Sequence, residues 1–145
     1  SKIIINDFLK WETKSKFDAV LIDAPCSSTG TVRRHPDIPY IKSNKDVAEL
    51  VELQRKMILK GYNLLRYGGY LLYSNCSILK KEGEGLMDEL MKDHSLSLCP
   101  IEKGPNDFDS SWVNTKGALR VLPSFWKHLG GIDGFYIALI KKLET

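Results

Sequence analysis

Two cysteines stand directly after two apolar, strand-like runs of this chain. The first lies in Asp23-Ala24-Pro25-Cys26-Ser27-Ser28-Thr29-Gly30 and the second in Tyr73-Ser74-Asn75-Cys76-Ser77. A single cysteine at the end of a strand is usually a small buried hydrophobic residue. Two cysteines, each flanked by serine at matching strand ends, indicate instead a site that uses two thiols, with the carboxylate of Asp23 beside them.

Three familiar kinds of thiol chemistry fit this pattern poorly. Hydrolytic cysteine enzymes pair the thiol with a histidine, and His35 is the only histidine near either segment. A cysteine phosphatase needs an arginine after five intervening residues, but that position is Val32 and Arg33 comes one residue late. Redox pairs are more often spaced as CxxC.

Methylation of a pyrimidine at C5 fits two thiols and an acid better. The C5 carbon is a poor nucleophile until a thiolate adds at C6 and makes C5 enamine-like. A neighbouring acid must hold or protonate N3 while charge develops on the ring. After methyl transfer, the C5 proton and the thiol must both leave, and two thiols with different tasks suit that sequence of steps.

Two strands must position these residues, and we expect them at residues 17–23 and 69–74. Both are continuous runs of apolar β-formers, which is typical of strands buried on both faces of a parallel sheet. Because ligands bind outside the carboxyl ends of such strands, Cys26 and Cys76 are expected to meet at one crevice.

A helix is expected to connect the two strands. Apolar residues recur at helical spacing over residues 47–65, Ser43 and Asp46 resemble a capping box, and Gly68-Gly69 is expected to stop the helix. Strand, helix and strand in this order predict a βαβ unit.

The remainder of the chain predicts a second helix, a long loop and a hairpin. The helix is expected at residues 82–93 with Leu86, Leu90 and Met91 inward, and the loop at residues 102–116. Two further strands, expected at residues 118–122 and 134–140, would form an antiparallel pair that closes one edge of the sheet. Cys99 stands in no comparable motif and is expected to be a core or surface residue without a catalytic role.

The composition bounds the class of protein. The formal net charge of +3 is mildly basic, which is compatible with a nucleic-acid partner but does not demonstrate one. The three cysteines are widely spaced and form neither a disulfide framework nor a metal-binding pattern, so free thiols in a reducing cytoplasm and no metal are expected. No apolar run approaches the roughly 20 residues that a membrane helix needs.

The ordered set of motifs resembles the Sun (Fmu) family of RNA 5-methylcytosine methyltransferases. Residues 23–30, followed by Arg33-Arg34-His35-Pro36-Asp37, are similar to the family's motif IV, and residues 73–77 are similar to its motif VI. Leu53-Gln54 and Gly131-Ile132-Asp133-Gly134-Phe135-Tyr136 also match. The resemblance spans essentially the whole chain.

The resemblance implies that Cys76 attacks cytosine C6 and that Cys26 assists release of the methylated RNA, with Asp23 beside the base. Two departures concern the second motif. The family usually has Thr where Asn75 stands and Pro where Lys80 stands, and Asn75 is expected to alter how the Cys76 loop is held. In DNA cytosine-5 methyltransferases the nucleophile comes instead from a Pro-Cys pair, so attack by Cys26 stays open as an alternative.

The cofactor implied by the resemblance is S-adenosylmethionine. Asp23, Ala24 and Pro25 would lie along it, and Asp7 resembles the acidic residue that contacts its adenine end. The strand-like run Ile3-Ile4-Ile5 precedes Asp7, but the glycine-rich turn that would bind the cofactor is not present. We therefore expect a longer native polypeptide, and a chain that binds cofactor poorly and is inactive alone.

The implied fold is α/β: residues 1–145 are expected to form the carboxyl-terminal part of a Rossmann-like methyltransferase domain with a terminal antiparallel hairpin. The implied substrate is RNA, ribosomal RNA first and transfer RNA next. Phosphate contacts are expected from Arg33, Arg34, His35 and Lys42. A non-catalytic RNA-binding relative remains an alternative, and the sequence does not predict an oligomeric state.

Overall fold

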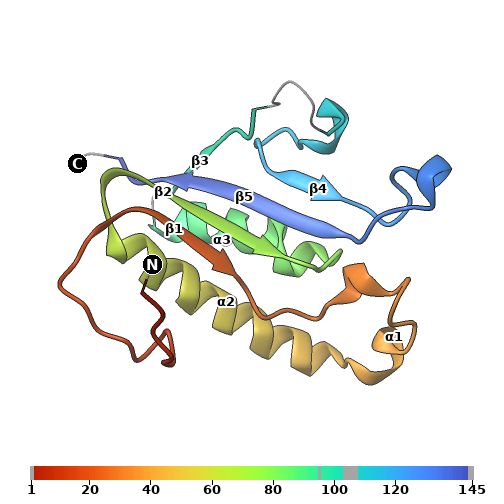
Figure 1. Ribbon diagram of the computed structural model, residues 1–145, viewed down its shortest axis with the longest axis horizontal. Coiled ribbons are helices and arrows are strands. Elements are labelled where there is room, and N and C mark those ends of the chain that lie inside the picture. The colour runs from red at the N-terminus through yellow and green to blue at the C-terminus, as the bar shows by residue number, and fades with distance from the viewer. Residues whose placement is uncertain (1, 95, 103–107, 144–145) are drawn as a thin grey trace.

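The computed structural model describes residues 2–94, 96–102 and 108–143. Within these residues, five strands form one mixed sheet in the order β1-β2-β5-β3, and β4 pairs with the other end of β5 (Figure 1). The strands are β1 (Phe17–Asp23), β2 (Leu65–Asn75), β3 (Ser97–Cys99), β4 (Leu119–Val121) and β5 (Phe135–Lys141). The expected α/β class is therefore confirmed.

Three α-helices in the described residues connect or follow the strands that precede Cys26 and Cys76. They are α1 (Ile38–Ile41), α2 (Asn44–Leu64) and α3 (Glu84–His94), and the long helix α2 joins β1 to β2. Strands β1 and β2 run parallel, so the predicted βαβ unit is confirmed. None of the helices in the described residues combines the length and apolar character that crossing a bilayer demands.

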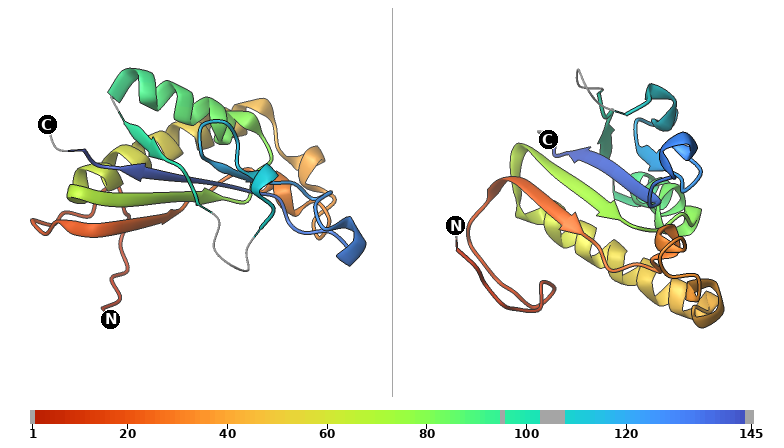
Figure 2. Two further views of the ribbon diagram at one scale, coloured as in Figure 1. Left: turned by 90° about the horizontal axis from the view of Figure 1, so that it is seen from above. Right: turned by 45° about the vertical axis from the view of Figure 1, so that its right-hand side comes forward.

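Helices α2 and α3 cover one face of the sheet (Figure 2). The core lies between them and that face, where Ile58 of α2, Leu90 of α3 and Leu71 of β2 are fully buried. The expectation that β1 is buried on both faces is wrong: Leu21 is 68% exposed, whereas its neighbour Ile22 is 4% exposed. Alternate residues point to opposite faces of a strand, and only one face of β1 is covered.

The start of α2 follows from a reciprocal pair of side-chain hydrogen bonds. Ser43 Oγ accepts from the Asp46 amide at 3.2 Å, and the Asp46 carboxylate accepts from the Ser43 amide at 2.8 Å. The predicted capping box is therefore confirmed.

Removal of this cap is expected to have a small effect on stability. Ser43→Ala leaves a first-turn amide without its acceptor and should lower the free energy of unfolding by about 1 kcal/mol in urea denaturation. Ser43→Asp supplies another capping acceptor and should retain most of the stability. Equal losses for the two variants would contradict this origin of the helix start.

The predicted stop of α2 at Gly68 and Gly69 is wrong. The helix ends at Leu64 and the chain extends at once into β2. The two glycines lie inside β2, where the register with β1 shifts between the Phe17 and Ala19 pairs. Gly68 adopts a φ of 76°, and its amide donates to the Lys142 carbonyl at 2.8 Å, so the glycines form an irregularity within the strand.

The amino-terminal run Ile3-Ile4-Ile5 does not form the strand that its composition predicts. Ile3 is 89% exposed and Ile5 98% exposed, and β1 is the edge strand of the sheet. One edge of β1 is therefore unpaired in the described part of the chain. A β-forming run becomes a strand only when its backbone pairs with a neighbouring strand, and Ile3-Ile4-Ile5 pairs with none among the described residues.

The second half of the chain follows the expected order with shifted boundaries. Helix α3 begins two residues later than predicted, and it buries Met87 where Met91 was expected. Within the expected loop a short 3-10 turn covers Ser110–Trp112, and residues 103–107 lie outside the described residues. The hairpin pairing of β4 with β5 is confirmed, and β3, which contains Cys99, completes the same edge of β5.

Candidate active site

The two cysteines lie side by side at the carboxyl ends of β1 and β2. Asp23 is paired with Ser74 in the parallel register, and the Ala24 amide donates to the Ser74 carbonyl at 2.9 Å. Just beyond this last rung, Cys26 Sγ lies 3.4 Å from Cys76 Sγ. The predicted approach of the two thiols is therefore confirmed, and both are partly buried free cysteines.

A glycine locks the two cysteine loops to each other and to the start of β5. The Gly30 amide donates to the Cys76 carbonyl at 2.8 Å, and the Gly30 carbonyl accepts from the Gly134 amide at 2.8 Å. A Cβ atom at Gly30 would overlap the Gly134 carbonyl and come within 2.7 Å of the Cys76 carbonyl oxygen. This close approach of three backbones explains why a residue without a side chain stands here.

Ser28 brings a hydroxyl to the sulfur of Cys76. It adopts a φ of 58°, a left-handed conformation that is uncommon for a residue with a side chain. The Cys76 thiol donates to Ser28 Oγ at 3.6 Å, and when Cys76 is ionised the hydroxyl can donate in the opposite direction. Cys76 thus has two neighbours able to donate to a thiolate: Ser28 and the Cys26 thiol.

The two thiols have different surroundings. Burial, followed by the charge and hydrogen bond of Cys76, raises the pKa of Cys26 to about 12, against an opposing hydrogen bond from the Ser28 backbone. Cys26 is therefore a neutral thiol at neutral pH. A neutral thiol next to Cys76 can donate to a thiolate there, but it is a poor nucleophile itself because the thiolate is the reactive form.

Because the pKa of Cys26 depends on Cys76, removal of Cys76 should shift the pH dependence of Cys26 alkylation. Cys76→Ala removes the neighbouring charge, so the pKa of Cys26 should fall while staying above its ordinary value because burial remains. At any pH below about 12 the variant then holds more Cys26 thiolate than the wild type. Iodoacetamide labelling of the Cys26 peptide, followed by mass spectrometry, should show a pH profile shifted toward lower pH. An unshifted profile would contradict the coupling.

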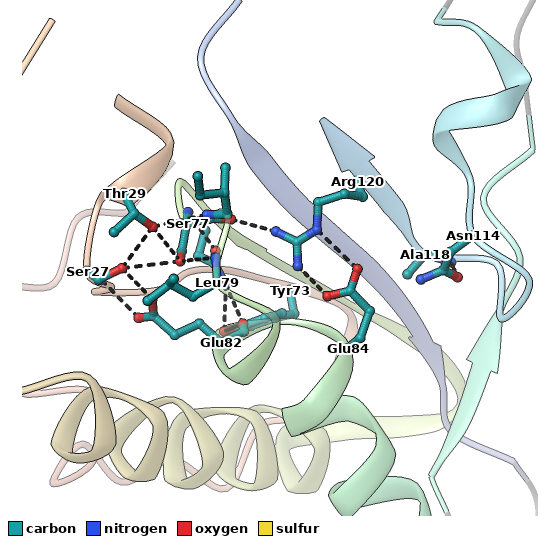
Figure 3. A network of polar contacts seen from close by, with 12 residues as sticks. Ser27, Thr29, Tyr73, Ser77, Leu79, Glu82, Glu84, Asn114, Ala118 and Arg120 are labelled. Carbon is teal, nitrogen blue, oxygen red and sulfur yellow. Dashed lines mark hydrogen bonds and ion pairs between the residues drawn. The ribbon is translucent and has the colours of Figure 1, made fainter. Parts of the chain in front are cut away.

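A buried polar network centred on Glu82 involves the residues that follow the two cysteines, Ser27 and Ser77 (Figure 3). The Glu82 carboxylate is fully buried and accepts from the Ser27 amide at 2.9 Å, from Ser27 Oγ at 2.5 Å and from Gln54 Nε2 at 2.9 Å. Ser27 Oγ also lies within hydrogen-bond distance of the hydroxyls of Thr29 and Ser77. The network connects the residue after Cys26 to helix α2 and to the residue after Cys76.

Asn75 holds the other side of the same network. Its side-chain amide donates to the Glu82 carbonyl at 2.8 Å and to Tyr73 Oη at 2.8 Å, and its Oδ1 accepts from the Ser77 amide at 2.9 Å. Asn75, fully buried, thereby fixes the turn that presents Cys76. That Asn75 holds this loop differently from the threonine usual in the family stays a prediction.

Arg120 of β4 supports the turn after Cys76 from the opposite side. It forms an ion pair with Glu84, stacks on Tyr136 with 4.6 Å from the guanidinium carbon to the ring centroid, and donates to the Ser77 carbonyl at 2.7 Å. Figure 3 shows Arg120 reaching across β5 toward the residues of this turn. The hairpin of β4 and β5 therefore takes part in positioning the site.

Asp23 lines a small cavity of about 150 Å³. The cavity is lined by Phe8, Leu21, Ile22, Asp23 and Met57. The exposed Asp23 carboxylate accepts from Ser74 Oγ at 3.4 Å. Asp7 immediately precedes the cavity residue Phe8 and is exposed, with its carboxylate accepting from the Leu9 amide at 2.9 Å.

The expected RNA-binding residues form an exposed basic segment after the Cys26 loop. Arg33 donates to the Gly130 carbonyl at 2.6 Å, and Arg34 pairs with Asp133 at 2.5 Å. The hydrogen bond and charge of Asp133 raise the pKa of Arg34. His35 and Lys42 are exposed near it in sequence.

Two positioning residues were not among the predicted site residues. Gln54 lies on the stripe of α2 that also buries Val47 and Ile58, and a polar residue on such a stripe is the signal that could have identified it. Glu82 follows two lysines, Lys80 and Lys81, and reads as part of a solvated charged segment. Its burial arises from a 3-10 turn that the sequence does not predict. Within the described residues, no group of three metal-ligating side chains is present.

Comparison with known proteins places this arrangement among RNA methyltransferases. The chain is 37% identical to ribosomal RNA small subunit methyltransferase B of Shewanella oneidensis over 91% of its own length and 28% of that protein. It is 41% identical to the protein of the same name from Yersinia enterocolitica, covering 92% of this chain and 28% of the relative. The chain thus spans little more than a quarter of the length of these curated relatives.

Solved structures agree with the sequence comparison. NSun6 from Pyrococcus horikoshii, crystallised with SFG, matches 99% of this chain and 35% of its own with a TM-score of 0.78 and 26% identity. A methyltransferase homologue from the same organism matches with a TM-score of 0.67 and 28% identity, over 89% of this chain and 40% of the other. The family model described as 16S rRNA methyltransferase RsmB/F matches residues 2–141. The chain therefore belongs to the RsmB/F family of 16S rRNA methyltransferases.

Proposed function

We propose that this chain supplies the thiol part of an active site that transfers a methyl group from S-adenosylmethionine to cytosine C5 in ribosomal RNA, in the cytoplasm. The observation that carries the proposal is the pair of sulfurs 3.4 Å apart with unequal surroundings. Membership of the RsmB/F family and relatives named ribosomal RNA small subunit methyltransferase B support this substrate over transfer RNA.

Cys76 is the proposed nucleophile. Its thiolate adds to C6 of the target cytosine, which forms the C6–S bond and places electron density on C5. Ser28 and the neutral Cys26 thiol are both within reach of the Cys76 sulfur, so they can donate to the thiolate before attack. Asp23, exposed at the mouth of the site, is the proposed acid that holds N3 as charge develops on the ring.

Cys26 is the proposed residue for release. Once Cys76 is bonded to carbon, its charge no longer raises the pKa of Cys26, so Cys26 ionises more readily at the stage that needs a base. The Cys26 thiolate then takes the C5 proton, and the electrons of that C–H bond restore the C5–C6 double bond. The C6–S bond breaks and Cys76 leaves as a thiolate.

The cofactor would lie along Asp7, Asp23, Ala24 and Pro25. The cavity beside Asp23 combines apolar walls with a carboxylate, which fits a ligand that has both an apolar and a cationic part. Its 150 Å³ is below the 300–1,000 Å³ common for ligand pockets, so the cavity fits only part of such a cofactor. S-adenosylmethionine, when bound, supplies the methyl group. NSun6, a structural relative, was crystallised with SFG, an analogue of this cofactor.

The RNA would approach over the exposed basic segment. Arg33, Arg34, His35 and Lys42 follow the Cys26 loop, where contacts to phosphates would position the strand without reading its sequence. The target cytosine would leave its stack to reach sulfurs that are partly buried.

The test of this function is methyl transfer by the full-length protein. With S-adenosylmethionine labelled in its methyl group and unmodified small-subunit ribosomal RNA, nuclease digestion should release labelled 5-methylcytidine. Transfer RNA should be labelled far more slowly. Label in another nucleoside, or none in either RNA, would overturn the proposal, and the second result together with retained RNA binding would favour a non-catalytic relative.

A further inference from the structure

We propose that Glu82 is a positioning residue that sets the separation of the two thiols, its side chain holding the Cys26 loop and its main chain holding the Cys76 loop. The proposal rests on the function proposed above. It assigns a role in the release step to a residue that does not touch either sulfur.

The side chain of Glu82 acts on both neighbours of Cys26. It accepts two hydrogen bonds from Ser27, from the amide at 2.9 Å and from the hydroxyl at 2.5 Å. Gln54 Nε2 donates to the same carboxylate at 2.9 Å and to the Pro25 carbonyl at 2.9 Å. The residue before Cys26 and the residue after it are therefore fixed by one pair of buried side chains.

The main chain of Glu82 acts on the neighbours of Cys76 in the same way. Its carbonyl accepts from Asn75 Nδ2 at 2.8 Å and from Tyr73 Oη at 3.0 Å. Asn75 in turn accepts from the Ser77 amide at 2.9 Å. The residues on both sides of Cys76 are thus held through the Glu82 carbonyl, which a change of the Glu82 side chain leaves in place.

The carboxylate is held by neutral donors alone in these contacts. A fully buried carboxylate is costly unless hydrogen bonds replace its water, and three such bonds converge on Glu82. Removing it would leave the Ser27 amide and one N–H of the Gln54 side chain without an acceptor. Glutamine at this position can keep both: its Oε1 accepts from the two N–H groups, and its Nε2 donates to Ser27 Oγ, which can donate on to Ser77 or Thr29.

Loss of the contacts that hold the Cys26 loop and loss of those that hold the Cys76 loop should therefore impair different steps of the reaction. Glu82→Ala releases the Cys26 loop and should impair the step that needs Cys26. Asn75→Ala releases the Cys76 loop and should impair attack at C6. Misplacement of a reacting group by 1 Å can cost about 100-fold in rate, so each defect should be at least about tenfold.

The experiment compares these variants in the full-length protein. The rate of adduct formation is measured with 5-fluorocytosine RNA, which blocks release, and the steady-state fraction of adduct is measured with ordinary RNA and cofactor. Glu82→Ala should form adduct within about threefold of the wild-type rate but accumulate about ten times more of it on ordinary RNA. Glu82→Gln should restore release, and Asn75→Ala should form adduct about tenfold more slowly without accumulation.

Leu90→Ala is the matched control, since it removes a fully buried side chain of α3 without touching the network. Its folded fraction should form and release adduct like the wild type. If Glu82→Ala slowed adduct formation and adduct release to the same extent, and Glu82→Gln restored neither, Glu82 would have a merely structural role and the proposal would be overturned. A wild-type protein that forms no adduct would overturn the proposed function itself, whereas a wild type that forms and releases adduct beside variants without the expected defects would overturn the positioning role alone.

Discussion

Cys26→Ala is expected to convert the full-length protein into one that stays covalently attached to its RNA. Attack by Cys76 and methyl transfer do not require Cys26, whereas removal of the C5 proton does. Loss of a positioned general base typically costs 10²–10⁴-fold, so turnover should fall by about 1,000-fold. With ordinary RNA and cofactor, a denaturation-resistant complex should accumulate, visible as a shifted band on a denaturing gel.

Cys99→Ala is the matched control for this variant. Cys99 is also a partly buried free cysteine, but it lies in β3, away from the β1 and β2 ends. It should turn over like the wild type and leave no adduct. If Cys26→Ala turned over normally, or formed no adduct even with 5-fluorocytosine RNA, the assignment of Cys26 to the release step would be wrong.

The second large effect is expected from Gly30→Ala. The added Cβ would overlap the Gly134 carbonyl and crowd the Cys76 carbonyl, and the backbone of both residues is held in place by hydrogen bonds of Gly30: its amide donates to the Cys76 carbonyl and its carbonyl accepts from the Gly134 amide. Overpacking of this kind should lower the free energy of unfolding by about 3 kcal/mol, since backbone cannot move aside as a side chain can. It should also displace Cys76 and slow adduct formation beyond what the loss of folded protein explains.

Gly68→Ala separates crowding from backbone conformation. Gly68 has a φ of 76° but nothing within 4 Å of an added Cβ, so the cost is conformational alone, about 1 kcal/mol. Adduct formation per folded molecule should be unchanged in this variant. Urea denaturation of both variants, combined with adduct assays, checks these expectations. Similar stabilities for the two would contradict the crowding at Gly30.

The parts of the fold that the sequence predicts well are those determined by nearby residues. The capping box at Ser43 and Asp46 needs only four residues, and the apolar run of β1 needs only seven. The approach of Cys26 and Cys76 was predictable because parallel strands joined by one helix end at the same edge of a sheet. That geometric rule requires no knowledge of individual contacts.

The parts that it predicts poorly depend on partners far along the chain. Gly68 reads as a helix stop, yet it lies within β2 because its amide finds the carbonyl of Lys142. The run at Ile3 has strand composition without a strand beside it. Glu82 reads as a surface charge until Ser27 and Gln54 are brought to it by folding.

The most direct test of the central claim identifies the sulfur that bonds to RNA. The full-length wild-type protein is trapped on 5-fluorocytosine RNA with cofactor, digested with protease and nuclease, and the nucleotide-bearing peptide is sequenced by mass spectrometry. The nucleotide is expected on Cys76, in a peptide that is absent from Cys76→Ala. A nucleotide on Cys26, with trapping retained in Cys76→Ala, would contradict this expectation and support the alternative in which the Pro25-Cys26 pair supplies the nucleophile.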